Sequence, residues 1–378
     1  MSATTTTPPT PWPTVKLGDV CEVVSVRGHQ IKQTEIKPTG RYPVVSQSER
    51  KIEGYSDEPI AIKDVPLILF GDHTCCVKFI DFPFIVGADG TKLLRPNMME
   101  LNYFRYCLEN ARESLCDGKY RRHFSDLIEM EIPLPPLEVQ REIVAKVEAG
   151  LKKADALVAH FKRLTTLADE TFKAELDETF TTLNAPTVKL GDVCEVARGG
   201  SPRPIKSYIT QAVDGLNWIK IGDVSPNGKY IEKTAEKIKP SGLHKTRRVS
   251  IGEFLLSNSM SFGRPYILKI DGCIHDGWLV LRGFQDVLEE NFFYHLLRTE
   301  YVQSQFETSA SGSTVRNLNT KSVESISIPL PSLDIQREIV GKLEAVKARC
   351  ERLKAEAERG MKAAEALRKA VLAEAFEQ

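Results

Sequence analysis

The feature that most constrains the fold is an internal repeat. Residues 14–23 read TVKLGDVCEV, and the same ten letters return at residues 187–196. A second pair follows in the same order, IPLPPLEVQREIVAKVEA at residues 132–149 and IPLPSLDIQREIVGKLEA at residues 328–345, with 13 identities in 18 positions. Repeated segments in a constant order indicate a tandem duplication. Each half therefore contains a globular domain that is followed by a helix.

The edges of the two halves match far better than the sequence between them. A duplication without functional consequence does not explain this difference, whereas a fixed frame that carries two differing domains does. We therefore predict an α+β fold with two similar mixed α/β domains separated by two long helices. The predicted parts are a disordered tail at residues 1–13, globular domains at 14–135 and 187–331, and helices at 136–186 and 332–378.

Both predicted long helices have the apolar spacing of a coiled coil. Between residues 137 and 183 the only glycine is Gly150, and proline is absent. Apolar residues recur in steps of three and four, with mixed charges on the opposite face. A long helix cannot bury such a stripe alone, so we predict that the two helices form an antiparallel coiled coil within the chain. Alternatively, each helix packs on its own domain or on another chain.

Both globular domains have the pattern of mixed α and β structure. Short β-rich runs such as PLILF at residues 66–70 and GWLVL at residues 277–281 are separated by glycine and aspartate turns. One helix is predicted around residues 102–115 and another around residues 291–306.

Composition excludes some classes of protein and leaves nucleic-acid binding open. The chain has no apolar run of about 18 residues, so no membrane span is expected. Its eight cysteines include no C-x-x-C pair, so we expect reduced thiols in a cytoplasmic protein and no structural zinc. The 51 basic and 51 acidic residues balance, which counts mildly against a nucleic-acid binder. A balanced total can still contain local basic patches.

Basic residues do cluster in loops, at matching places in the two halves. A group after Gly118 precedes the first IPLP segment, just as residues 312–317 precede the second, and an Arg-Gly step follows each TVKLGDVCEV segment. Glycine allows close approach of a backbone, and arginine can bind phosphate or the O6 and N7 atoms of guanine. The candidate DNA contacts are Arg27, Gly28, Lys78, Lys119, Arg121, Arg122, His123, Arg198, Gly199, Ser201, Arg203, Lys206, Lys245, Arg247, Arg264, Arg316 and Asn317. For any one of them, a solvated surface charge is an equally good interpretation.

The sequence lacks the common catalytic and cofactor motifs. It contains no G-x-x-x-x-G-K-[ST] loop, no G-x-G-x-x-G after a strand, no Asn-Pro-Pro-aromatic or Asp-Pro-Pro-aromatic run, no H-E-x-x-H and no G-x-S-x-G. His275 beside Asp276 is the only histidine pairing of note, and a turn is its simpler interpretation. We therefore predict that the chain alone performs no catalysis and binds neither a cofactor nor a metal.

The two V-K-L-G-D-V-C segments, the two I-P-L-P-x-L-x-x-Q-R-E-I-V segments and the R-G-G-S-P run at residues 198–202 resemble the specificity subunits of type I restriction–modification systems. The resemblance extends over nearly the whole chain after Pro13. It implies that the globular parts are target recognition domains, each reading one part of a split double-stranded DNA target, and that the helical pair sets the unread gap.

The same resemblance implies partner proteins. Two modification (methyltransferase) subunits would bind the helices, bring S-adenosylmethionine and methylate an adenine in each half-site, and restriction (endonuclease/translocase) subunits would cleave unmodified DNA. We expect the partner-binding residues to include Gln140, Arg141, Gln336 and Arg337, which lie in the repeated Q-R-E segments.

Two other functions fit parts of the sequence. The chain could itself methylate or cut DNA, but the missing motifs argue against this. It could also be a coiled-coil scaffold that joins two protein-binding domains. Absence of salt-sensitive DNA affinity in any reconstituted complex would favour the scaffold.

Overall fold

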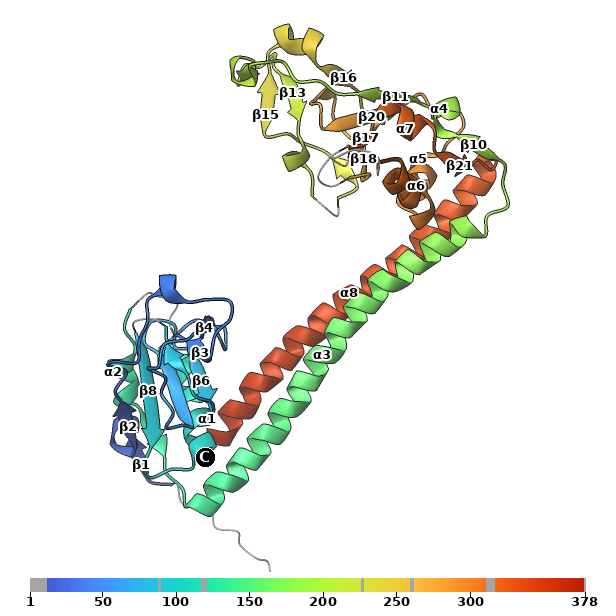
Figure 1. Ribbon diagram of the computed structural model, residues 1–378. Helices are drawn as coiled ribbons and strands as arrows, with labels where there is room; N and C mark the ends of the chain where they lie inside the picture. The colour runs from blue at the N-terminus through green and yellow to red at the C-terminus, as the bar shows by residue number, and fades with distance from the viewer. Residues whose placement is uncertain are drawn as a thin grey trace, which may run out of the picture. The chain divides into compact units, whose positions relative to one another are not determined.

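The computed structural model describes residues 12–87, 90–116, 121–225, 228–258, 262–310 and 317–376 (Figure 1). Its contacts divide the chain into unit 1, Met1–Arg163 with Ala357–Gln378, and unit 2, Leu164–Glu356. Each unit contains one globular domain and a part of each of two long helices, α3 (Leu137–Thr181) and α8 (Leu333–Phe376). Both domains mix helices and strands, which confirms the predicted α+β class. The expected disordered tail lies, up to residue 11, outside the described residues.

The domain of unit 1 combines two sheets with two helices. The first sheet is antiparallel and has the order β2 (Cys21–Val24), β8 (Thr91–Pro96), β5 (Leu67–Gly71) and β6 (Val77–Ile80). The remaining elements are the three-stranded sheet of β4 (Gly54–Ser56), β3 (Tyr42–Val45) and β7 (Ile85–Val86), helices α1 (Leu101–Leu115) and α2 (Phe124–Ile128), and the 3-10 turns η1 (Leu17–Val20) and η2 (Gln33–Glu35). Strand β5 is apolar throughout because both of its faces are buried.

The domain of unit 2 has two five-stranded sheets. One has the order β11 (Glu195–Arg198), β20 (Trp278–Arg282), β17 (Phe254–Ser257), β18 (Pro265–Leu268) and β14 (Tyr230–Ile231). The other has the order β12 (Ile209–Thr210), β15 (Glu236–Ile238), β13 (Leu216–Ile219), β19 (Gly272–Ile274) and β16 (Arg247–Val249). Its helices and 3-10 turns are α4 (Leu190–Val193), α5 (Glu290–Leu296), α6 (Glu300–Ala310), α7 (Thr320–Glu324), η3 (Ile205–Ser207), η4 (Ile221–Asp223) and η5 (Pro240–Lys245).

The two repeated segments of each half pair with each other. In unit 1, β1 (Thr14–Lys16) runs antiparallel to β9 (Glu131–Pro133). In unit 2, β10 (Thr187–Lys189) pairs in the same register with β21 (Ser327–Pro329). These two-stranded sheets bring the two ends of each domain together immediately before a long helix begins. The segments that match between the two halves are therefore the ones that hold the ends of each domain together.

A buried glutamine fixes each long helix to its domain. The Gln140 Oε1 atom accepts a hydrogen bond of 2.8 Å from the amide of Glu100, and its Nε2 atom donates one of 2.8 Å to the carbonyl of Pro135. Gln336 makes the same contacts with Glu289, at 2.8 Å, and Pro331, at 2.9 Å. Glu100 and Glu289 are the N-caps of α1 and α5.

This arrangement corrects an expectation from the sequence. Gln140 and Gln336 were expected to bind a partner, but both side chains are buried, with exposed fractions of 1% and 0%. Their hydrogen-bonding groups are already used inside the unit. Both glutamines therefore have a structural role, and this role accounts for their place in both repeats.

The long helices pair antiparallel within unit 1. Gly150 of α3 lies against Val371 of α8, and Phe161 lies over Gly360, so residue numbers rise along one helix as they fall along the other. A Cβ atom on Gly150 would lie 2.7 Å from a methyl carbon of Val371, so glycine permits the close approach. The guanidinium of Arg368 also donates a 2.6 Å hydrogen bond to Asp155. These contacts agree with the predicted antiparallel pairing.

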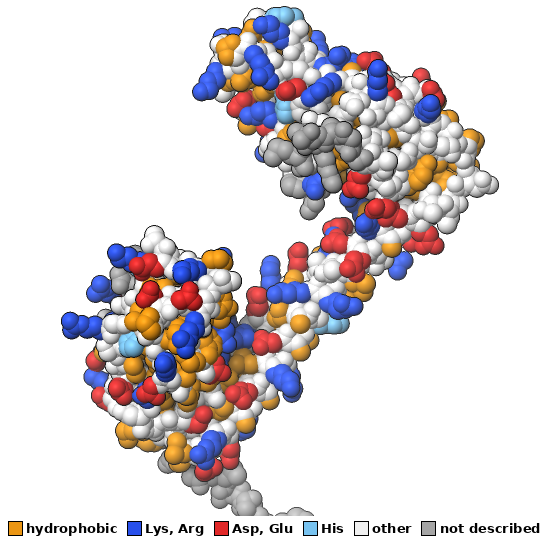
Figure 2. All heavy atoms as spheres, viewed as in Figure 1, with side chains coloured by type: hydrophobic (Ala, Val, Ile, Leu, Met, Phe, Trp, Pro, Cys, Tyr) orange, Lys and Arg blue, Asp and Glu red, His pale blue; other side chains and the backbone are white. Residues whose placement is uncertain are grey.

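The same helices also pair within unit 2. Lys354 of α8 forms an ion pair with Asp169 of α3, and Ala168 and Cys350 are buried. Figure 2 shows basic and acidic side chains interspersed along the helices, as expected for solvated faces. In the same unit, Phe180 of α3 packs on Phe292 of α5 with ring centroids 5.2 Å apart. The helix stripe is thus buried partly by the other helix and partly by the domain.

Two further expectations need correction. The helix predicted around residues 291–306 is two helices, because the buried Thr299 ends α5 and caps α6: its hydroxyl contacts the carbonyl of Leu296 at 2.7 Å and the amide of Val302 at 3.3 Å. The eight cysteines are not all thiols, because Cys75 and Cys116 form a disulfide with Cα atoms 6.4 Å apart. These cysteines are 41 residues apart, so spacing could not reveal the pair.

The other six cysteines are free, and all but Cys21 are buried. Across the described ranges, the structure contains no group of three or more histidine, cysteine, aspartate or glutamate side chains that could hold a metal ion. Within those same ranges, no helix has both the length and the apolar character that crossing a membrane requires.

The glutamine clamp yields a stability prediction. Replacing Gln336 by leucine would leave the amide of Glu289 and the carbonyls of Val287 and Pro331 without their partner. Unsatisfied buried groups of this kind cost about 1–3 kcal/mol each, so we expect a loss of at least about 2 kcal/mol in the free energy of unfolding, measured with urea. The matched control is Arg337→Leu at the adjacent exposed position, where a change below about 0.5 kcal/mol is expected. Equal effects of the two substitutions would contradict the clamp.

A buried histidine predicts acid sensitivity in unit 2. His295 has no exposed surface, and burial lowers its pKa to about 4, although its Nε2 atom lies 3.1 Å from Glu344. The unfolded chain binds this proton near the ordinary pKa of 6.5, so lowering the pH between 6.5 and 4 favours unfolding, by an amount on the order of 3 kcal/mol. Urea unfolding between pH 7 and pH 4 should show a flatter profile for His295→Gln. Parallel profiles for the two proteins would refute this assignment.

Candidate nucleic-acid interface

The loop that follows β11 in unit 2 is built by close backbone contacts. The amide of Gly199 donates to the carbonyl of Trp278 at 2.9 Å, and the amide of Gly200 donates to the carbonyl of Ile274 at 3.1 Å. A Cβ atom on Gly199 would overlap the carbonyl of His275, and one on Gly200 would lie 2.8 Å from the carbonyl oxygen of Lys245. Both glycines are required here because the loop lies directly against neighbouring backbone.

A basic cluster gathers around this loop. Arg198 donates to the carbonyl of Asp276 at 3.2 Å, and Arg247 donates to the carbonyl of Arg198 at 2.7 Å. The guanidinium of Arg203 lies 3.9 Å from the Asp276 carboxylate and is 83% exposed. The ammonium of Lys245 lies 5.6 Å from the centre of the Tyr208 ring. The structure thus brings together four cations that are separated in the sequence.

Asp276 organises the cluster through both its carboxylate and its backbone carbonyl. The hydroxyl of Ser201 donates a 2.7 Å hydrogen bond to Asp276, and this bond holds the pKa of that carboxyl below its usual range. The side-chain amide of Asn258 donates to the backbone carbonyl of Asp276 at 2.8 Å. The backbone carbonyl of Asn258 accepts from the amide of Leu318 at 3.1 Å. The predicted contacts at residues 198–203 are therefore linked through Asp276 and Asn258 to Leu318, the residue after Asn317.

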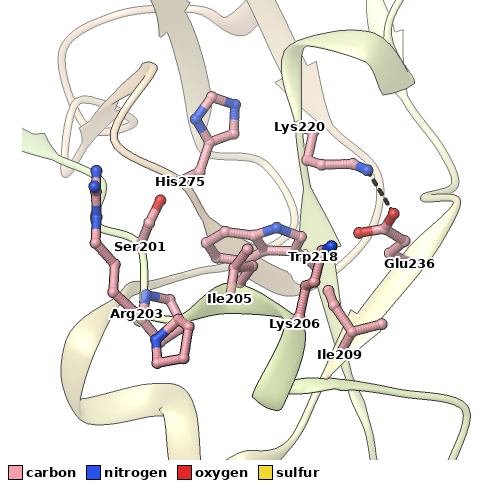
Figure 3. Close-up of a pocket in the computed structure, with 11 residues that line it drawn as sticks. Ser201, Arg203, Ile205, Lys206, Ile209, Trp218, Lys220, Glu236 and His275 are labelled. Atoms are coloured by element: carbon pink, nitrogen blue, oxygen red, sulfur yellow. Dashed lines mark ion pairs between the residues drawn. The ribbon is translucent and has the colours of Figure 1, made fainter.

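A pocket of about 1060 Å³ opens beside the cluster (Figure 3). Its walls come from the loop and from three strands of the second sheet. The lining residues are Ser201, Pro202, Arg203, Pro204, Ile205, Lys206, Ile209, Trp218, Lys220, Glu236 and His275. Sequence reasoning included Ser201, Arg203 and Lys206. It missed Trp218 of β13, Lys220 directly after that strand and Glu236 of β15, which carry no motif.

His275 is part of the architecture of this pocket. Its two ring nitrogens lie 3.2 Å from the amide of Ile221 and 2.8 Å from the amide of Gly277, and burial lowers its pKa. The carbonyl of His275 accepts from the amide of Trp278 at 3.2 Å. The turn expected at His275 and Asp276 is therefore present, and the imidazole lies at the pocket wall.

In unit 1, the loop that contains Arg121 and Arg122 is held by the turn after β5. The Asp72 carboxylate accepts from the amides of His123, at 3.0 Å, and Phe124, at 2.9 Å. His73 contacts the carbonyl of Arg121 at 3.2 Å. The Arg121 side chain forms an ion pair with Asp126, and Arg122 is exposed.

Two candidates from unit 1 are buried. The ammonium of Lys78 donates to the backbone carbonyls of Ser46, at 2.7 Å, and Arg50, and burial lowers its pKa. His123 is 1% exposed and lies at the start of α2. Neither side chain is available to contact DNA in this structure, because each is enclosed by its own unit.

The remaining candidates lie on the surface or outside the described residues. Arg27 and Gly28 form an exposed turn, in which Gly28 has a φ of 82°. Arg264 and Asn317 are exposed in unit 2, whereas Lys119 and Arg316 lie outside the described residues.

Of the expected partner-binding residues, only the arginines are on the surface. Arg141 donates to Glu138 at 2.6 Å, and Arg337 donates to Asp334 at 2.9 Å, each within the first turn of its helix. Both guanidinium groups are well exposed. The two arginines thus occupy equivalent, accessible positions on the two long helices.

Comparisons with known proteins agree with the duplicated architecture. A family model described as a type I restriction modification DNA specificity domain matches residues 9–159 and 184–359. The specificity subunit of the type I restriction enzyme EcoR124I/EcoR124II from Escherichia coli is 22% identical over 346 residues, which cover 86% of this chain and 84% of that one.

Two solved structures share the fold. One, from work on complex assembly and conformational transition of the type I R-M system, has a TM-score of 0.68 and 23% identity, and the match covers 97% of this chain and 98% of that one. The other, the HsdS subunit from Thermoanaerobacter tengcongensis, has a TM-score of 0.57 and 21% identity, with 97% of each chain covered.

The close approach at Gly199 generates a prediction. Gly199→Ala places a methyl group against the carbonyl of His275, so the loop must shift. We expect a loss of about 1–3 kcal/mol in the free energy of unfolding, measured with urea, because overpacking of an ordered site has this size. Gly222→Ala is the matched control, since a Cβ atom there meets nothing within 4 Å. If Gly199→Ala proves as stable as this control, the loop is not held as described.

Proposed function

Because this chain belongs to the family of type I restriction modification DNA specificity proteins, we propose that each of its globular domains reads one half of a bipartite DNA target. The observation that carries this proposal is the repeated frame around two different reading surfaces. Both domains are closed by the same strand pair and the same glutamine clamp. The basic loops, in contrast, differ in sequence between the two units, which fits two different half-sites.

The loops have the chemistry that DNA reading requires. In unit 2, Arg198, Arg203 and Arg247 lie around one backbone turn, and two glycines keep that turn tight against the sheet. In unit 1, Arg122 is exposed on a loop anchored by Asp72. Arginine binds phosphate and guanine edges with a fixed geometry, so anchored arginines can both position and specify a duplex.

The long helices fit the roles of spacer and docking surface. Their paired faces are buried, and their outer faces carry exposed charges (Figure 2). Two modification subunits would dock on these helices, with Arg141 and Arg337 among the contacts, and the length of the helical pair would set the gap between half-sites. Membership of the type I restriction modification specificity family supports assembly with modification and restriction subunits.

Catalysis in this proposal belongs to the partners. S-adenosylmethionine would be bound by the modification subunits, and the target adenine would leave the base stack to reach their active sites. The chain has no net charge, so phosphate contacts would be shared with these subunits, because backbone contacts normally dominate affinity.

The direct test is selection of DNA from a random duplex pool by the chain together with its modification subunit. The expected result is a split motif, with two specified parts separated by a fixed number of unspecified base pairs. A single continuous motif, or no enrichment in low salt, would refute the proposal. Binding of S-adenosylmethionine to the purified chain alone would contradict the assignment of the cofactor to the partner.

The independence of the domains can be tested by paired variants. We expect Arg121→Ala with Arg122→Ala to relax the motif in one half-site only, and Arg198→Ala with Arg247→Ala to relax the other. Loss of one base contact weakens affinity by about 10- to 100-fold, as measured by competition with mutated half-sites. Val213→Ala, at a position that is 99% exposed and lies outside the long helices and the basic loops, should leave both half-sites unchanged. Simultaneous loss of both half-sites in either double variant would show that the domains do not read independently.

A further inference from the structure

The pocket of unit 2 has a volume and a lining that suit a small ligand. At about 1060 Å³ it lies near the upper end of the range for ligand sites. Much of its wall is apolar, because Pro204, Ile205, Ile209 and Trp218 are among the lining residues. Figure 3 shows the two isoleucines and the indole at this site. Most of the indole is covered, since Trp218 is 2% exposed. The isoleucine and proline faces are therefore the surfaces on which a flat ring could lie.

A donor and an acceptor stand side by side on another wall of the pocket. The ammonium of Lys220 lies 2.9 Å from the carboxylate of Glu236, and each side chain keeps more than a third of its surface exposed. Glu236 is held opposite Trp218 by the pairing of β15 with β13. Nucleobase edges place hydrogen-bond donors next to acceptors, so this ion pair offers a complementary edge.

The charge at the pocket is positive. Arg203, Lys206 and Lys220 contribute three cations, and Glu236 is the one carboxylate among the lining residues. Burial lowers the pKa of His275, whose imidazole also lies at the pocket wall. The Arg203 guanidinium is 83% exposed and lies 3.9 Å from the Asp276 carboxylate, so a phosphate can compete for this loose ion pair.

We propose that this pocket binds one unstacked nucleobase together with the phosphate attached to its nucleoside. The ring lies against Ile205, Ile209 and Pro204, its edge meets Lys220 and Glu236, and the phosphate is bound by Arg203 and Lys206. Two sources could supply this ligand chemistry, a strand of the DNA target or a free mononucleotide. Only the first source rests on the proposed function.

The variants are chosen to fill the pocket or to change its edge. Ile209→Trp adds bulk at a partly exposed position of the lining, and Val213→Trp adds the same side chain at a position that is 99% exposed. Glu236→Gln keeps the shape of the side chain while changing the acceptor that faces the base. Urea unfolding of the full chain shows whether each variant is folded before binding is measured.

In the first arm, the full chain is titrated with each of the four deoxynucleoside monophosphates, and binding is followed by saturation-transfer NMR of the nucleotide. The expected result is saturable binding that Ile209→Trp weakens at least about tenfold and Val213→Trp leaves unchanged. Glu236→Gln should change the order of preference among the four nucleotides.

In the second arm, the chain and its modification subunit bind a selected duplex in which 2-aminopurine replaces one base at a time. A fluorescence increase is expected at one position in the half-site that unit 2 reads, and Ile209→Trp should abolish it. An increase caused by a base that enters the partner's active site would persist in Ile209→Trp, so the two are distinguishable.

The outcomes separate this proposal from the proposed function. A pocket-dependent signal in the second arm identifies the DNA strand as the ligand, and a signal in the first arm alone identifies a free mononucleotide. If Ile209→Trp and Val213→Trp behave alike in both arms, the proposal is overturned. If no DNA is selected at all, the DNA-reading function fails, and the first arm still decides whether the pocket binds a nucleobase.

Discussion

The whole architecture depends on the antiparallel pairing of the two repeated segments within each half. Because β1 pairs with β9, and β10 with β21, the ends of each domain are held together directly before a long helix begins. The buried Gln140 and Gln336 then tie the first turns of these helices to the caps of α1 and α5. With entry and exit fixed in this way, the sequence between them can change without moving the frame.

Acidic side chains position the basic loops in both units. The Asp276 carboxylate accepts from Ser201 and lies 3.9 Å from Arg203, while the backbone carbonyl of Asp276 accepts from Arg198. The Asp72 carboxylate accepts backbone amides at the end of the loop that carries Arg122. This arrangement allows exposed basic loops in a chain of zero net charge. A carboxylate that is used to orient a loop cancels charge in the total, while the arginines beside it remain exposed at the surface.

Several residues that stood out in the sequence have structural functions. Lys78 supports backbone carbonyls, His123 begins α2, and the two glutamines of the Q-R-E segments are clamps. Repetition of a residue in both halves indicates constraint, but packing and binding produce the same signal. Exposure separates them: Arg141 and Arg337 remain on the surface next to the buried glutamines. The disulfide between Cys75 and Cys116 was missed because its cysteines are distant in sequence.

The sequence by itself determined the duplication, the α+β class, the long helices with their antiparallel pairing, and the loops in which cations gather. Repeats, apolar periodicity and composition indicate these features, and each of these signals can be recognised directly along the chain. Only the tertiary structure decided which polar residues are buried, where α5 ends, and that Trp218, Lys220 and Glu236 meet at one pocket. The pocket forms because strands that are distant in sequence pair with each other. The spacing of residues along a single sequence does not predict which strands pair.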